Sequence, residues 1–181
     1  GLPLMLLDCP ALYDRPGNPY LDAKGHDWAD NATRFGLLSR IAALLGEAAT
    51  PLDWRAEVVH ANDWQTALAP AFLRYAKGAA SVVTVHNIAF QGNFERPMLA
   101  ALGLPEEAWR FDGVEYHGQL SFLKAGLQFA SQISTVSPTY AREIQDELFG
   151  YGLAPLLRHR RTHLRGILNG IDTAIWNPAA D

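Results

Sequence analysis

A histidine and an amide stand together at the point where a strongly apolar segment of the chain stops. Residues 81–85 read Ser-Val-Val-Thr-Val, a β-branched run typical of a buried strand, and His86 and Asn87 follow directly. In an open α/β sheet, ligands bind beyond the carboxyl ends of the strands. An imidazole and an amide at that point could hold a substrate by hydrogen bonds. The alternative is that His86 only closes the strand.

Polar residues also follow three other predicted strands. They are His60 to Asp63 at the end of residues 56–60, Ser137-Pro138 after residues 132–136, and Asn169-Gly170 after residues 164–168. Parallel strands bring their carboxyl ends to one edge of a sheet, so these groups should line one cleft. Asp63 is either a carboxylate of that cleft or an ordinary helix N-cap. Asn169-Gly170 is either part of the cleft or a simple turn.

Other kinds of site find little support in the sequence. His60, Asp63 and His86 could be pictured around a metal ion, but no cysteine or second carboxylate accompanies them, so we predict no metal and no cofactor. Gly150-Tyr151-Gly152 follows no predicted strand and lacks the third glycine of a dinucleotide fingerprint. The absence of that fingerprint from the sequence counts against a Rossmann oxidoreductase.

The elements that must position these residues alternate along the chain. Strands are predicted at residues 2–8, 56–60, 81–85, 132–136 and 164–168. Helices are predicted from Asp27 or Asp30, over 63–75 with a kink at Pro70, over 121–130, from Pro138, and over 153–161. Residues 87–119 should form a long insertion with short helical pieces near 97–102 and 105–109. This alternation predicts an α/β fold, a Rossmann-like parallel sheet with helices on both faces, in one domain spanning residues 1–181.

Composition excludes several classes of protein. The chain has 181 residues, 49% of them hydrophobic, and a net charge of −4, which indicates a globular domain and argues against nucleic-acid binding. The single Cys9 cannot form an internal disulfide, and no apolar run is long enough for a membrane span, so we expect a cytoplasmic protein without a membrane partner. The basic run 158–165 is either a solvated helix face or a patch for an anionic or glycan partner. Both ends look cut, so we expect a piece of a longer protein.

Several blocks of the sequence, taken in order, resemble the bacterial glycogen synthases and their relatives, the starch synthases of plants and algae. The blocks are residues 13–20, 58–66 (VVHANDWQT), 84–92 (TVHNIAFQG), 122–126 (FLKAG), 136–144 (VSPTYAREI) and 166–172 (GILNGID). The resemblance covers essentially the whole chain.

This resemblance implies the N-terminal, acceptor-side half of a GT-B glycosyltransferase, in which two Rossmann-like domains face each other. The family's first strand, with its Lys-Thr-Gly-Gly loop, and its C-terminal nucleotide-binding domain would lie outside this chain. The implied reaction transfers glucose from ADP-glucose to the non-reducing 4-hydroxyl of an α-1,4-glucan, with retention and without a metal ion. The fragment alone is expected to be inactive.

The resemblance also implies roles for individual residues. Asp63 and His86 are the expected catalytic residues, and Tyr20, Asn87 and Asn169 are expected to line the sugar and acceptor site. Positions 62 and 65 are left out, because some relatives carry His there. The rival interpretation is a non-catalytic glycan-binding module with a degenerate cleft, which would be expected to lose this set of residues.

Overall fold

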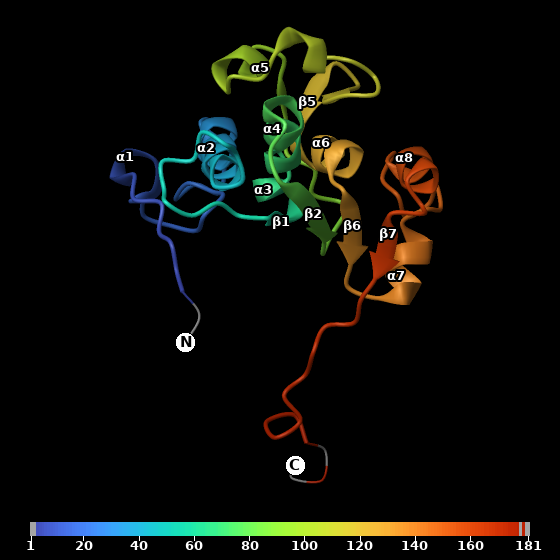
Figure 1. The fold of residues 1–181 in the computed structure, drawn as a ribbon. Helices are drawn as coiled ribbons and strands as arrows, with labels where there is room; N and C mark the ends of the chain where they lie inside the picture. The colour runs from blue at the N-terminus through green and yellow to red at the C-terminus, as the bar shows by residue number, and fades with distance from the viewer. Residues whose placement is uncertain (1–2, 178, 180–181) are drawn as a thin grey trace.

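A four-stranded parallel sheet lies at the centre of the molecule, which is a computed structural model that describes residues 3–177 and 179. Its strands are β1 (Val58–Asn62), β2 (Ala80–Val85), β6 (Gln132–Thr135) and β7 (Leu164–Gly166), in the order β1-β2-β6-β7. All three strand pairs are parallel, so the carboxyl ends of the strands share one edge, as Figure 1 shows. The predicted α/β fold with a parallel sheet is confirmed.

Helices precede and connect these strands. α1 (Pro10–Tyr13) lies where no helix was predicted. The helices at predicted places are α2 (Asn31–Leu44), α3 (Asp63–Thr66), α4 (Ala69–Ala76), α6 (Phe122–Phe129), α7 (Pro138–Glu143) and α8 (Ala154–His159). The helix predicted over 63–75 is divided into α3 and α4, because Pro70 lies in the first turn of α4, where its missing N–H costs nothing. Ser137 caps α7, the helix predicted from Pro138, by accepting a hydrogen bond from the backbone N–H of Tyr140 at 2.9 Å.

The insertion after β2 carries a second, antiparallel sheet that the sequence did not predict. Its strands are β3 (Asn93–Glu95), β4 (Glu115–Tyr116) and β5 (Gln119–Ser121), in the order β3-β5-β4. The predicted helical pieces are present as α5 (Met98–Ala101) and the 3-10 helix η1 (Glu106–Ala108). Strands of two or three residues are too short to show a period-2 pattern, which explains why they were missed.

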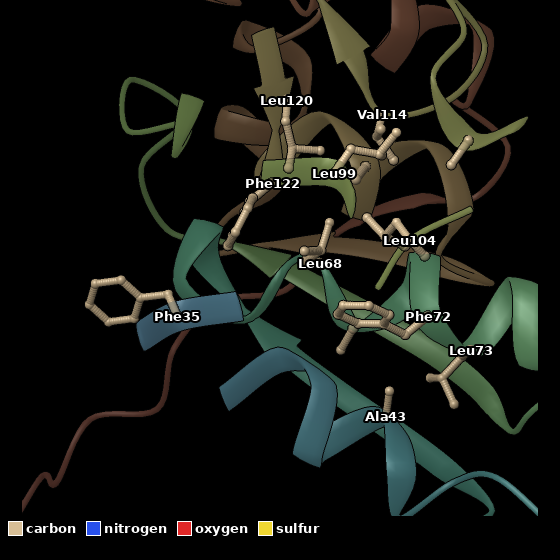
Figure 2. Close-up of a cluster of buried hydrophobic side chains, with 14 of the residues drawn as sticks. Phe35, Ala43, Leu68, Phe72, Leu73, Leu99, Leu104, Val114, Leu120 and Phe122 are labelled. Atoms are coloured by element: carbon tan, nitrogen blue, oxygen red, sulfur yellow. The ribbon is translucent and has the colours of Figure 1, made fainter. Parts of the chain in front are cut away.

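Apolar side chains from the insertion and from α2, α4 and α6 form one of two buried clusters. Figure 2 shows how Phe35 and Phe72 from two of these helices lie in the same cluster as Leu99, Leu120 and Phe122. The second cluster packs α6, α7 and α8 against β2, β6 and β7. The buried Lys124 links α6 to the insertion, because its ammonium donates to the backbone carbonyls of Phe111 and Glu115.

The helices cover one face of the main sheet, whereas the sequence predicted helices on both faces. Val59 and Ala61 of β1 are buried, but their neighbours Val58, His60 and Asn62 are exposed. The same alternation continues in β2. Period-2 alternation is the pattern of a sheet buried on one side, so β1 itself carried this signal. Within the described residues, the second face of the sheet has no helical layer.

The strand predicted at residues 2–8 is wrong for the part that the structure describes. Residues 3–9 have no regular secondary structure, and Leu4 and Leu6 are 84% and 90% exposed. An apolar run becomes a strand only where a neighbouring strand supplies hydrogen-bond partners, and no described strand pairs with these residues. Residue 2 lies outside the described part. The prediction of a single domain over residues 1–181 stays a prediction.

None of the helices within residues 3–177 and 179 combines the length and the apolar character needed to cross a bilayer.

Candidate functional site

Asp63 links the carboxyl end of β1 to the carboxyl end of β2. It is the first residue of α3, so it is not the N-cap that the structural alternative required. Its carboxylate Oδ1 accepts the backbone N–H of His86 at 2.7 Å. Its φ of 52° lies in the left-handed region, which a non-glycine residue occupies at a cost of about 1–3 kcal/mol. The contact with His86 therefore holds a strained residue in place, and such strain is typical of functional sites.

The imidazole of His86 is fixed at one nitrogen and exposed to solvent. Its Nε2 lies 3.1 Å from Oδ1 of Asn62, the last residue of β1. When that amide oxygen accepts, Nε2 carries a hydrogen, and Nδ1 of the neutral ring is left as an acceptor. A ring held in this way is already ordered, so it can accept a hydrogen bond from a sugar hydroxyl with little further loss of side-chain entropy.

The loop after β2 is fastened by hydrogen bonds from two more elements. Thr135 at the end of β6 donates its hydroxyl to the carbonyl of Val85 at 2.8 Å. The backbone N–H of Ile88 donates to the hydroxyl of Tyr140, from α7, at 3.0 Å. The pKa of Tyr140 is raised, chiefly by burial; the hydrogen bond from Ile88 acts to lower it, and the negative charge of Asp63 acts to raise it.

Asn87 turns the loop with its own side chain. Its Oδ1 accepts the backbone N–H of Ala89 at 3.0 Å, and its carbonyl accepts that of Phe90 at 3.4 Å. The side chain is exposed, and its amide NH₂ group makes no hydrogen bond within the described residues. Asn87 can therefore donate to a ligand while its oxygen keeps the turn in shape.

Tyr20 comes from the loop before α2 and reaches the start of α3. Its hydroxyl accepts a hydrogen bond from Nε2 of Gln65 at 2.9 Å. Its ring lies 6.3 Å from that of Trp64, centroid to centroid, and Trp64 is partly buried against the first apolar cluster. The fold thus brings Tyr20 next to the residues that follow Asp63, although 43 positions separate the two in the sequence.

Asn169 lies on the same edge of the sheet but farther from His86. It follows β7, the fourth strand in the order, and the backbone N–H of Ile167 still donates to the carbonyl of Thr135 at 2.7 Å. Asn169 is exposed and makes no contact with Asp63 or His86 among the hydrogen bonds of the described part of the chain. The structure therefore joins four of the five predicted residues through short chains of contacts and leaves Asn169 apart.

Three residues that the sequence analysis did not assign also belong to this arrangement. Asn62 holds the His86 ring, Gln65 holds the Tyr20 hydroxyl, and Tyr140 holds the loop. Asn62 and Gln65 flank Asp63 in the sequence, and this proximity was the available signal. Nothing in the local sequence of Tyr140 indicated a contact with a residue 52 positions away.

In the described ranges, 3–177 and 179, no group of three or more His, Cys, Asp or Glu side chains is arranged to hold a metal ion. His60 makes a hydrogen bond instead, because its Nε2 lies 2.6 Å from the hydroxyl of Thr84 on the exposed face of the sheet.

Comparison with known proteins gives a consistent result. Residues 1–159 match the family model described as the starch synthase catalytic domain. The chain is 80% identical over 180 residues to the glycogen synthase of Dechloromonas aromatica and 57% identical over 183 residues to that of Nitrosomonas europaea. These alignments cover 99% and 100% of this chain but 37% of each relative, so the chain spans little more than a third of their length.

Among solved structures, the chain is similar to the catalytic domain of starch synthase IV from Arabidopsis thaliana bound to ADP and acarbose. The TM-score is 0.73 at 32% sequence identity, and the match covers 86% of this chain and 33% of the other.

Proposed function

Because this chain belongs to the starch synthase catalytic domain family, we propose that it forms the acceptor-side half of a GT-B glucosyltransferase. The proposed enzyme transfers glucose from ADP-glucose to the 4-hydroxyl at the non-reducing end of an α-1,4-glucan, with retention. The 80% identity to a glycogen synthase over nearly the whole chain carries this proposal. The Arabidopsis starch synthase, bound to ADP and acarbose, supports a nucleotide-sugar donor and a glucan acceptor. We propose no cofactor, since ADP-glucose is a substrate.

The geometry around His86 suits this chemistry. In the reaction, the bond from the anomeric carbon to the diphosphate breaks, a bond to the acceptor O4 forms, and the O4 proton is released. Positive charge develops at the sugar in an oxocarbenium-like transition state. A carboxylate and a fixed, exposed imidazole at one sheet edge can bind the sugar hydroxyls and stabilise that charge. We propose this role for Asp63 and His86, with Tyr20, Asn87 and Asn169 lining the sugar and acceptor site.

A chimera tests the function with this chain's own residues. The chain would replace the matching segment of Dechloromonas aromatica glycogen synthase, which it aligns with over 180 residues. We expect the chimera to transfer labelled glucose from ADP-glucose to glycogen, and we expect the 181-residue chain alone to transfer none. The leaving diphosphate needs electrostatic contacts that the chain alone is not expected to supply, and losing even one such contact typically costs about 10²–10³ in rate.

Two outcomes would contradict the proposal. A chimera that folds and binds glycogen but transfers no glucose would favour the non-catalytic glycan-binding module. Glucose transfer by the isolated chain would show that this half needs no second domain. The natural glycogen synthase, assayed in parallel, reports whether the assay itself works.

A further inference from the structure

We propose that Tyr140 is a positioning residue for the site at His86 and Asn87, acting through the backbone of Ile88. The proposal rests on the proposed function, because the loop matters to catalysis only if His86 and Asn87 bind the sugar. Tyr140 lies in α7, beyond the strand that neighbours β2, and it does not need to touch a substrate.

The first support is the hydrogen bond itself. Ile88 is 1% exposed, so its N–H cannot turn to bulk water, and the Tyr140 hydroxyl accepts it at 3.0 Å. A buried N–H without an acceptor is costly, so removal of the hydroxyl should force the loop to shift until the N–H finds another partner. Ile88 is two residues from His86 and next to Asn87, so such a shift would move both.

The second support is that the other hydrogen bonds from neighbouring elements hold the loop at its two ends and not at Ile88. Thr135 holds the carbonyl of Val85 and Asp63 holds the N–H of His86. The bonds made by Asn87 close the turn on itself and do not tie it to the sheet. Farther on, Gln91 donates to the carbonyl of Tyr151 at 2.9 Å. Between His86 and Gln91, Tyr140 is the only side chain from another element that holds the loop backbone among the described hydrogen bonds.

The third support is that Tyr140 is not needed to begin its own helix. The Ser137 hydroxyl caps α7, and Ala141 and Ile144 anchor the helix in the second buried cluster. Removal of one oxygen from Tyr140 leaves these interactions intact. An effect of Tyr140→Phe on catalysis would therefore come from the loop and not from loss of α7.

The test compares two matched variants of the chimera, Tyr140→Phe and Tyr75→Phe. Tyr75 is also a half-buried helical tyrosine whose pKa is raised by burial, and its ring packs against Phe129 at 5.7 Å between centroids. Its hydroxyl makes no hydrogen bond to any residue in the described ranges. We expect Tyr140→Phe to lower kcat about 10- to 100-fold with a smaller change in KM, since a displacement of about 1 Å can cost about 10²-fold. Tyr75→Phe should leave kcat unchanged.

Hydrogen–deuterium exchange of the peptide 86–91 provides the readout that separates positioning from stability. We expect this peptide to exchange faster in Tyr140→Phe than in the unmodified chimera. In Tyr75→Phe it should exchange at the unmodified rate. Faster exchange with unchanged kcat would overturn the proposal, because the bond would then be structural only. A lower kcat with unchanged exchange would also overturn it, because Tyr140 would then act by another route.

Three further cases keep the inference testable. If Tyr140→Phe does not fold, slow exchange of the Ile88 amide in the unmodified chimera supports the proposed bond, and exchange at the rate of an unstructured peptide overturns it. If the unmodified chimera folds but makes no glucan, the proposed function fails, and with it the catalytic role of Tyr140. If the chimera is active and Tyr140→Phe is as active, only the role of Tyr140 fails.

Discussion

At the scale of single residues, the position of Asp63 decides how its role can be tested. Its carboxylate accepts the His86 N–H at 2.7 Å from a backbone with a φ of 52°. Asparagine tolerates this left-handed conformation and offers an oxygen of the same reach, whereas alanine does neither. The two substitutions therefore separate the charge of Asp63 from its contact with His86.

We expect Asp63→Asn in the chimera to keep the melting temperature close to that of the parent and to lower kcat far more than it raises KM. The reason is that the negative charge would act mainly in the transition state. Asp63→Ala should lower both kcat and the melting temperature. Steady-state kinetics beside thermal melts measure this, and an Asp63→Asn variant with normal kcat would contradict a catalytic charge.

His86→Ala tests the exposed imidazole. The ring contacts Asn62 at 3.1 Å and is otherwise exposed, so its removal should change the stability of the chimera little. We expect kcat to fall on the order of 10²-fold, because a hydrogen-bonding group fixed at the reacting sugar would be lost. A variant that melts early yet turns over normally would return His86 to the role of a strand-closing residue.

At the scale of secondary-structure elements, the packing of α6 on α3 controls how the site edge is supported. Gly126 of α6 lies so close to α3 that a Cβ on it would meet both the Cβ and the carbonyl oxygen of Ala67 at 2.8 Å. These atoms belong to the backbone or to its first side-chain carbon, so they cannot move aside as a flexible side chain would. The close approach of α6 therefore depends on the absence of a side chain at this position.

We expect Gly126→Ala to lower the free energy of unfolding by about 1–3 kcal/mol through overpacking. Alanine is about 1 kcal/mol more favourable than glycine within a helix. Helix propensity alone would therefore raise the free energy of unfolding. Urea unfolding of the 181-residue chain measures the change. Gly170→Ala is the control, since a Cβ there meets nothing within 4 Å and the free energy should hardly change. A stabilised Gly126→Ala variant would show that α6 can move away from α3.

The basic run 158–165 shows how an element's surroundings change the meaning of its sequence. Arg158 makes an exposed ion pair with Glu147, which fits the predicted solvated face. Arg160 is half-buried and donates to the backbone carbonyls of Leu127, Gln128 and Ala130 at the end of α6. These are the carbonyls that a helix leaves without intrahelical partners at its C-terminus, so Arg160 is a helix cap supplied from another element.

At the scale of the whole molecule, the described residues provide the sheet edge that carries Asp63 and His86, and one sheet face without a helical layer. The chain spans 37% of the length of the glycogen synthases it matches. We propose that the donor contacts come from the part of these relatives that this chain does not cover. His86, Asp63 and Tyr20 offer hydrogen bonds and one negative charge, which suit a sugar better than a diphosphate.

We expect EDTA to leave the activity of the chimera unchanged. The described part of this chain offers no cluster of metal-ligating side chains near Asp63 and His86, and the proposed chemistry relies on protein groups to stabilise charge. Glucose transfer assayed with and without the chelator measures this. Activity that disappears with EDTA and returns with a divalent cation would contradict the prediction and would assign the metal to the other half of the enzyme.

The sequence by itself determined the order and type of the main elements and the sheet edge at which the candidate site residues lie. Val58–Asn62 and Ala80–Val85 each contain valine pairs, and the polar residues at their ends are local features that the sequence shows directly. The cap at Ser137 and the break at Pro70 follow from single-residue chemistry in the same way. The fold class follows from this alternation, because parallel strands joined by helices have few other arrangements.

Only the tertiary structure decided which side chains meet. The contacts of Asp63 with His86, of Tyr140 with Ile88 and of Tyr20 with Gln65 join positions 23, 52 and 45 residues apart. Such pairs depend on strand register and helix packing, which no local pattern encodes. The same reason explains the two main corrections. Residues 3–8 form no strand, and no strand in the described part of the chain pairs with them. One face of the sheet has no helical layer in that part. Both features depend on what packs against a segment and not on its own residues.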